Sequence, residues 1–302
     1  MPTYDFQLNE FNRLLPGPPA TIEEITQKFP LMAVPVDAVD GEIISIEVFA
    51  NRPDCLGVEG LARAFAGFTG RKTGLPRYQA AEDIPPFDVY VKPAMKNYRP
   101  YLAMAKVANL SLSEEAVKTI FTFQEKLHTT HCRNRRKASI GLYDIRAGNL
   151  EPPIFMKMAK VDEVSFLPLD ETTQMTLGQV LRDTPKGREF SHLVPKDQVP
   201  LLLDNNGIVL SLIPILNANN SRVTAETTDL FVDCTGSDWQ TMISAFNMML
   251  TALIDRGGRI DPATIHYEYA TPGGEEVHLP DFAPKSMTLD PAYVNKRLGV
   301  EL

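Results

Sequence analysis

The chain has 302 residues, of which 44% are hydrophobic and 23% are charged, and its formal net charge is −8. This length exceeds what a single core usually organises, so we expect two domains in a globular chain whose acidic surface repels nucleic acid outside a local basic patch. No run of about 18 apolar residues is present and the N-terminus has no signal-peptide pattern, which predicts a soluble, cytoplasmic protein without membrane contact.

Residues 1–75 are predicted to form a small α/β domain. Thr21-Ile22-Glu23-Glu24 has the form of a capping box, which indicates a short helix that ends before Pro30. The segment 42–49 alternates apolar and polar residues and predicts a strand. A second helix begins at Val58, because apolar residues recur there on one helical face.

Residues 76–86 have little periodicity and three prolines, and we take them as a linker. A larger mixed domain follows over 87–271, which makes the fold class α+β. Its expected strands lie at 89–91, 101–107, 138–143, 154–160, 207–213 and 263–269. Its expected helices lie at 114–127, 176–181 and 238–256, and we expect Gly257 and Gly258 to end the last one. Residues 272–302 read as a linker and the truncated start of another domain.

The sequence contains no phosphate-binding glycine loop, so we do not expect the chain to bind ATP. Cys55, Cys132 and Cys234 lie far apart, which argues against both a disulfide framework and a zinc ribbon. His128 and His131 with Cys132 offer metal donors, but no further ligands stand at a recognisable spacing. We therefore expect a helix end at the surface there and no metal site.

Arg133, Arg135, Arg136 and Lys137 form the only dense basic cluster of the sequence. Two interpretations remain open for this cluster: a solvated face without further function, or a contact with nucleic acid.

Small polar residues occur among apolar strand residues in the segment 200–236. Asp233 and Thr235 face the same side of their predicted strand, and Ser211 lies on a neighbouring one. These three side chains are therefore candidates to meet at one cavity. The alternative is that Asp233 and Thr235 only cap the helix that begins near Asp238.

Three segments, in this order and spacing, resemble the beta subunit of phenylalanyl-tRNA synthetase of the archaeal and eukaryotic type. They are Asn51-Arg52-Pro53-Asp54 with Val58-Glu59-Gly60-Leu61-Ala62-Arg63, Val232-Asp233-Cys234-Thr235-Gly236, and Thr251-Ala252-Leu253-Ile254-Asp255-Arg256-Gly257-Gly258. The resemblance covers nearly the whole chain. It implies an N-terminal domain, then a B3/4 editing domain over 87–271 with a β-sheet or barrel-like core flanked by helices, and the start of a B5-like domain over 272–302. Cys234 departs from the apolar residue expected there, and we expect its thiol to pack like one.

The resemblance implies an enzyme that proofreads: B3/4 hydrolyses the ester of mischarged Tyr-tRNA(Phe). The partners would be tRNA(Phe), tyrosine as editing-site ligand, and an alpha subunit in an (alpha-beta)2 heterotetramer. No cofactor is implied for this part of the chain, although the complete synthetase uses ATP and Mg. The resemblance places Leu202, Ser211, Asp233 and Thr235 in the editing pocket, with Asn217 and His192 near it. We expect Ser211, Asp233 and Thr235 to act in hydrolysis and Leu202, Asn217 and His192 in substrate binding. The local positive charge of Arg133, Arg135, Arg136 and Lys137 makes these residues the candidates for tRNA contact.

Two rival functions remain open. In the first, the chain is a non-catalytic module for tRNA binding and assembly of the synthetase. In the second, it is a free-standing deacylase that acts in trans. A pure tRNA anchor loses salt-dependent binding when the charges at 133–137 are removed, yet shows no hydrolysis.

Overall fold

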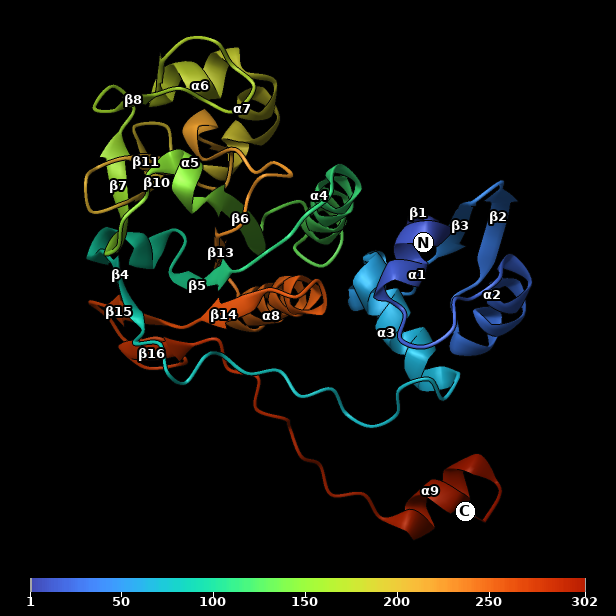
Figure 1. The fold of residues 1–302 in the computed structure, drawn as a ribbon. Helices are drawn as coiled ribbons and strands as arrows, with labels where there is room; N and C mark the ends of the chain where they lie inside the picture. Colours follow the sequence, from blue (N-terminus) through green and yellow to red (C-terminus); the bar gives the residue numbers. More distant parts are fainter. Residues whose placement is uncertain (1, 302) are drawn as a thin grey trace.

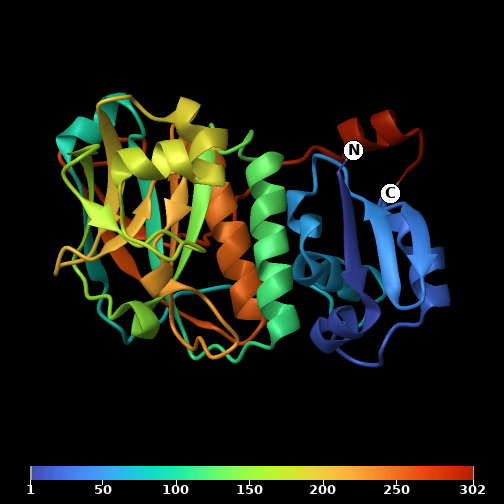
Figure 2. The same ribbon diagram turned by 90° about the horizontal axis from the view of Figure 1, so that it is seen from above.

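The computed structural model describes residues 2–301 and has the expected α+β fold class. Figure 1 shows a small N-terminal unit, a larger unit of sheets and helices, and a C-terminal helix at the end of an extended segment. The two units lie side by side in both views (Figures 1 and 2).

The N-terminal unit is a three-stranded antiparallel sheet with three helices packed against it. The strands are β1 (Thr3–Gln7), β2 (Val36–Asp40) and β3 (Ile43–Glu47), in the order β1-β3-β2. The helices are α1 (Leu8–Leu14), α2 (Ile22–Lys28) and α3 (Val58–Phe68). Phe6, Phe11, Phe29 and Phe65 form a contiguous group of rings at its centre, with centroids 5.5 to 6.0 Å apart.

The larger unit contains two main sheets and a two-stranded one. The seven-stranded sheet has the order β12-β11-β10-β7-β4-β15-β16. Its strands are β4 (Phe87–Val91), β7 (Ile154–Lys160), β10 (Gln198–Leu203), β11 (Val209–Leu212), β12 (Leu216–Asn217), β15 (Ala263–Tyr267) and β16 (Glu276–Leu279). The four-stranded sheet has the order β14-β5-β13-β6, with β5 (Tyr101–Ala108), β6 (Ala138–Asp144), β13 (Leu230–Gly236) and β14 (Arg259–Asp261). The short pair is β8 (Ser165–Phe166) and β9 (Met175–Thr176).

Two of the helices that follow the small unit lie between it and the sheets of the larger unit, and the last helix stands apart at the C-terminal end. The α-helices after the small unit are α4 (Glu114–Thr129), α5 (Ile145–Gly148), α6 (Leu177–Asp183), α7 (Pro185–Phe190), α8 (Trp239–Asp255) and α9 (Pro291–Leu298). Helix α8 packs on β5, β6 and β13, and α4 packs on β6. Figure 2 shows α4 and α8 between the small unit and the sheets of the larger one.

Local capping explains where the predicted helices begin. The side chains of Thr21, Ser113 and Asp238 each accept a hydrogen bond from a backbone N–H in the first turn of the helix that follows. Thr176 and Gln179 complete a reciprocal capping box at α6. The predicted end of α8 is also confirmed, because Gly257 adopts a φ of 93° that favours glycine.

One expected linker is partly a strand. The segment after Thr271 contains β16, which pairs with β15 and extends the seven-stranded sheet beyond residue 271. Val277 and Leu279 point inward and are buried, while Glu276 and His278 are exposed. The prolines and glycines around this short alternation hid the strand from sequence inspection. Elements β1, α1 and β2 were missed as well.

A buried ion pair joins the small unit to α8. Arg256 lies 2.5 Å from Glu59 and 3.4 Å from Glu10, and all three side chains are buried. The apolar core is continuous across this contact, from Phe65 through Phe123 to Phe246. The two units are therefore packed together rather than strung on a flexible tether.

Candidate active site

The polar residues predicted to converge lie at one cavity of about 200 Å³. Its walls come from β6 and β13, from the β11–β12 hairpin, and from α4 and α7. The cavity is lined by apolar side chains that include Phe121, Leu212 and Ile213, and by polar side chains that include Ser139, Tyr143, Ser211, Asn217, Asp233 and Thr235. It exceeds the roughly 150 Å³ of a cavity that accepts a benzene ring, so it offers room for one aromatic side chain and a few more atoms.

Asp233 belongs to a hydrogen-bonded chain at one side of the cavity. The Tyr143 hydroxyl lies 2.6 Å from Asp233 Oδ1 and 2.9 Å from Ser211 Oγ. Burial raises the pKa of Asp233 to about 7, although the hydrogen bond from Tyr143 and the charge of Arg99 act in the opposite direction. A carboxyl group that titrates near neutral pH suits proton transfer at physiological pH.

Thr235 and Ser139 belong to a second chain, which begins at the buried guanidinium of Arg99. Arg99 Nε donates to Thr235 Oγ1 at 2.9 Å, and Arg99 Nη2 donates to Ser139 Oγ at 2.9 Å. Arg99 also donates to the backbone oxygens of Arg135 and Thr235. Burial lowers the pKa of Arg99 from its usual value, but guanidinium groups remain protonated in proteins.

Thr235 and Ser139 together keep one hydroxyl proton that can be donated to a ligand in the cavity. Thr235 Oγ1 and Ser139 Oγ lie 3.1 Å apart and each accepts from Arg99. Their mutual hydrogen bond uses one of the two hydroxyl protons, and the other is free to donate to a ligand. The cavity therefore has a donor beside Arg99 and a carboxyl group at Asp233.

Two predicted substrate-binding residues, Asn217 and Leu202, lie close to this site in different ways. Asn217 lines the cavity and donates from Nδ2 to the backbone oxygen of Leu142 at 3.1 Å. Leu202 pairs directly with Ser211 across β10 and β11, but it is fully buried in the core and does not line the cavity.

His192 does not reach the cavity, contrary to its predicted neighbourhood. It lies in a short 3-10 helix after α7, where its side chain is exposed and its Nδ1 lies 3.0 Å from the backbone oxygen of Glu189. The helix that brings this segment to the cavity presents Lys186 instead.

The basic cluster divides between surface and interior. Arg133 and Arg136 are exposed, and Lys137 forms an ion pair with Asp238 at 3.2 Å. Arg135 is buried, which contradicts its predicted place in an exposed tRNA contact. The cause is the backbone: residues 133, 134 and 135 all have positive φ, and this left-handed turn directs the third side chain inward.

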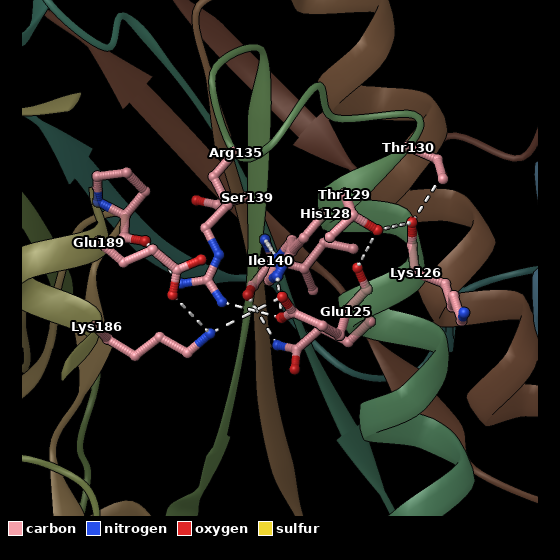
Figure 3. Close-up of polar contacts among 12 residues, drawn as sticks. Glu125, Lys126, His128, Thr129, Thr130, Arg135, Ser139, Ile140, Lys186 and Glu189 are labelled. Carbon is pink, nitrogen blue, oxygen red and sulfur yellow. Dashed lines mark hydrogen bonds and ion pairs between the residues drawn. The ribbon is translucent and has the colours of Figure 1, made fainter. Parts of the chain in front are cut away.

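Arg135 lines the cavity, and Figure 3 shows it beside Glu125 among the polar contacts of this region. Its guanidinium donates to the backbone oxygens of Pro214 and Ile215 and forms an ion pair with Glu125 at 3.0 Å. It also stacks over the Phe190 ring at 4.4 Å from the centroid. Arg135 thereby joins α4, α7 and the β11–β12 hairpin around the opening.

His128 faces the cavity as a neutral imidazole. Its Nε2 accepts a hydrogen bond from the backbone N–H of Ile140 at 2.8 Å, so the proton resides on Nδ1, which lies 3.4 Å from Glu125. Burial lowers its pKa to about 4. Because both ring nitrogens are engaged, His128 is not placed to take a proton from a ligand or a water molecule.

Within residues 2–301, no group of three or more His, Cys, Asp or Glu side chains is arranged to hold a metal ion. In the same range, no helix is long and apolar enough to cross a membrane. Cys234 is fully buried in the core, as expected for a thiol that replaces an apolar residue.

Arg99, Ser139 and Tyr143 were not predicted as site residues. Ser139 and Tyr143 stand in a strand whose alternation carries a weak signal, because Ser139, Gly141 and Tyr143 share the face that meets the cavity. Arg99 precedes β5 without any periodic pattern, and only the three-dimensional structure places it beneath Thr235.

Comparison with known proteins gives one consistent family. The chain is 38% identical to the phenylalanine–tRNA ligase beta subunit of Methanosarcina acetivorans over 283 residues, which is 93% of this chain and 50% of the relative. It is 36% identical to that of Methanocaldococcus jannaschii over 306 residues, which is 100% of this chain and 54% of the relative. The chain thus spans about half the length of these curated relatives. No protein-family model matches it.

A solved structure agrees with these sequences over the full chain. An N-terminal fragment of the phenylalanyl-tRNA synthetase beta subunit from Pyrococcus horikoshii superposes with a TM-score of 0.91 at 34% identity, covering 100% of this chain and 86% of the fragment. The fold, the order of elements and the sequence therefore match together, and the chain belongs to the family of phenylalanyl-tRNA synthetase beta subunits.

Proposed function

We propose that this chain carries the proofreading site of a phenylalanyl-tRNA synthetase, in a B3/4-type domain that hydrolyses the ester bond of tyrosine attached to tRNA(Phe). The observation that carries the proposal is the cavity of about 200 Å³, in which a buried carboxyl group and a set of hydroxyl groups face apolar walls. By the same family relation, an alpha subunit and tRNA(Phe) are the proposed partners.

The chemistry of the two amino acids explains why such a cavity is useful. Tyrosine differs from phenylalanine by one hydroxyl group, and an apolar synthetic pocket rejects an added hydroxyl only about a hundredfold. A second cavity that hydrogen-bonds this group selects tyrosine, since phenylalanine would leave each buried polar partner unpaired at a cost of roughly 1 to 3 kcal/mol. Ser211 and Asn217 supply such partners, which leaves Asp233 and Thr235 for the ester.

Hydrolysis of the ester requires a positioned water molecule and a donor for the oxyanion that develops on the carbonyl oxygen. The free hydroxyl proton of the Thr235–Ser139 pair is a donor of this kind, because Arg99 holds both oxygens in place. Asp233 is the group suited to accept the proton of the attacking water, given its pKa of about 7.

A covalent mechanism is not supported by the geometry. Ser211 is hydrogen-bonded to Tyr143, and Thr235 to Arg99 and Ser139, so neither hydroxyl has an imidazole base beside it. His128 in the same cavity has both nitrogens engaged. Water is therefore the proposed nucleophile.

The test measures deacylation of tyrosyl-tRNA(Phe) by the chain in complex with an alpha subunit. Asp233→Ala and Thr235→Ala should each lower the rate, and removal of one oxyanion donor typically costs about a hundredfold or more. The matched control is His192→Ala, because His192 lies outside the cavity and should leave the rate unchanged. Deacylation that is unchanged in both cavity variants would refute the assignment.

The exposed part of the basic cluster is the proposed contact with the tRNA backbone. Arg133→Ala and Arg136→Ala should weaken tRNA binding and reduce its salt dependence, because each removed phosphate contact lowers the slope by about one. Arg135 is excluded from this contact by its burial.

A further inference from the structure

Tyr143 stands between two polar groups of the cavity and contacts both. We propose that Tyr143 is a positioning residue that transmits the charge state of Asp233 to the Ser211 hydroxyl, and so decides whether Ser211 offers a ligand an acceptor or a donor. The inference rests on the proposed function, since it concerns how the same cavity selects an aminoacyl ester.

When Asp233 is ionised, two acceptors compete for the single hydroxyl proton of Tyr143. The Tyr143 hydroxyl has one proton and two neighbours, Asp233 Oδ1 at 2.6 Å and Ser211 Oγ at 2.9 Å. The carboxylate is the stronger acceptor and the closer one, so it receives this proton. Ser211, which accepts from Tyr143 in the structure, must then turn its hydroxyl to donate to the Tyr143 oxygen, and the free side of Ser211 Oγ presents lone pairs to the cavity.

When Asp233 is protonated, its carboxyl group becomes a hydrogen-bond donor. The carboxyl group then donates to the Tyr143 oxygen, and Tyr143 donates to Ser211 Oγ. The proton of Ser211 is no longer engaged by Tyr143 and is free to point into the cavity. One protonation at Asp233 therefore reverses the direction of both hydrogen bonds, and the Tyr143–Ser211 bond then has the direction that the structure shows.

The packing shows that this arrangement is built into the strand pair. Gly141 lies opposite Asp233 in the pairing of β6 with β13. A Cβ atom at Gly141 would lie 2.1 Å from the Tyr143 hydroxyl oxygen and 2.2 Å from Asp233 Oδ1. Only glycine leaves room for the Tyr143–Asp233 hydrogen bond, and Tyr143 is itself 1% exposed, which holds its ring in one position.

The charged and titratable groups near Asp233 come from several elements around the cavity. They are Tyr143 from β6, Cys234 from β13, Arg99 from the segment before β5, His128 from α4, Arg135 from the turn before β6, Lys186 from α7, and Asp170 at the rim. His128 stays neutral above about pH 4, and the Cys234 thiol stays protonated because burial raises its pKa. Asp233, with a pKa of about 7, is thus the buried group that changes charge near neutrality.

The consequence is a cavity with one fixed donor and one reversible group. Arg99 keeps the donor of the Thr235–Ser139 pair in place at any pH, because the guanidinium does not titrate. Ser211 is an acceptor above the pKa of Asp233 and a donor below it. A ligand that places a hydroxyl or ammonium donor against Ser211 is therefore bound more tightly on the alkaline side.

The kinetic experiment compares Tyr143→Phe, Ser211→Ala and the double variant, in complex with an alpha subunit and with tyrosyl-tRNA(Phe) as substrate. In the parent chain, the effect of Ser211→Ala on KM should change roughly three- to tenfold between about pH 6 and about pH 8, the value of one neutral hydrogen bond. In the Tyr143→Phe background, this effect should no longer depend on pH. The matched control is Tyr267→Phe, which loses hydrogen bonds of a buried tyrosine outside the cavity and should keep the parent pattern.

A second measurement does not depend on hydrolysis. A ¹³C NMR titration of the Asp233 carboxyl carbon should give a midpoint near 7, which moves upward by roughly one pH unit in Tyr143→Phe, because the lost hydrogen bond favours the ionised form. Binding of free tyrosine, followed by calorimetry across the same pH range, reports on Ser211 directly.

The outcomes separate the two proposals. Absence of deacylation in the parent chain refutes the proposed function, while the titration and tyrosine binding still decide the role of Tyr143. An unchanged Asp233 midpoint in Tyr143→Phe overturns the positioning role, and so does an effect of Ser211→Ala with the same pH dependence in both backgrounds. Circular dichroism of each variant excludes global unfolding as the cause of a loss.

Discussion

Replacement of Gly141 by alanine is the sharpest test of how the cavity is packed. The new Cβ would lie 2.1 Å from the Tyr143 hydroxyl oxygen and 2.2 Å from Asp233 Oδ1. To reach 3.4 Å, the upper end of the range of tight contacts, these oxygens must move by about 1.3 Å and 1.2 Å, respectively. That displacement breaks their 2.6 Å hydrogen bond inside the core.

Two costs add in this variant. Overpacking a core by one methyl group typically destabilises a protein by about 1 to 3 kcal/mol. A buried carboxyl group that loses its hydrogen bond costs about 1 to 3 kcal/mol more. We therefore expect Gly141→Ala to lower the free energy of unfolding by roughly 2 to 6 kcal/mol, and to lower tyrosyl-tRNA(Phe) deacylation in whatever fraction still folds.

Urea unfolding followed by circular dichroism measures this free energy, with an unchanged slope as the sign that only stability has changed. Gly67→Ala is the matched control, since its Cβ would lie 3.8 Å from the nearest atom and within helix α3. Alanine there should stabilise the helix by up to about 1 kcal/mol. A loss below about 0.5 kcal/mol for Gly141→Ala would refute the packing argument, because a surface substitution has that size.

Further predictions concern buried charges. Arg256→Met should destabilise the fold by about 3 to 5 kcal/mol in urea unfolding, because it leaves Glu59 and Glu10 buried without a cation, whereas Lys92→Met at an exposed pair should cost less than about 1 kcal/mol. Asp233 has a folded-state pKa of about 7, above its usual value of 3.8, so its contribution to stability is full below pH 3.8 and is lost as pH rises to about 7. Asp233→Asn should remove this fall from a pH series of unfolding curves. His128 has a folded-state pKa of about 4, below its usual value of 6.5, so its pH dependence is the reverse of that of Asp233. Its contribution to stability is full above pH 6.5 and is lost as pH falls to about 4. His128→Gln should remove this fall from the pH series.

Sequence patterns predicted most of the regular structure because their causes are local. The helices α4, α6 and α8 begin at side chains that cap their own first turns. Three of the strands that were missed, β1, β2 and β16, are short and lie at sheet edges. Their alternation is too brief to separate from a loop, and the pairing that stabilises them lies elsewhere in the chain.

The sequence predicted site residues only where they lie on the same strand. Alternation along β13 brought Asp233 and Thr235 to one face, which the structure shows at the cavity. Tyr143 belongs to the site because β6 pairs with β13, and Arg99 because its hydrogen bonds reach Thr235 and Ser139; the sequence shows neither contact. Arg135 shows the reverse error: four adjacent basic residues suggested one exposed surface, but a left-handed turn sends one of them inside.

The segment between β7 and β10 has a hydrophobic core of its own. Phe166, Leu177, Val180 and Phe190 pack there on the sheet, apart from the main core of the molecule. Because this cluster is smaller than the main core and separate from it, its amide hydrogens should exchange with solvent by local opening, well before those of β13. Helix α7 carries Lys186, which lines the cavity, so the same opening would move this side chain away from the cavity wall.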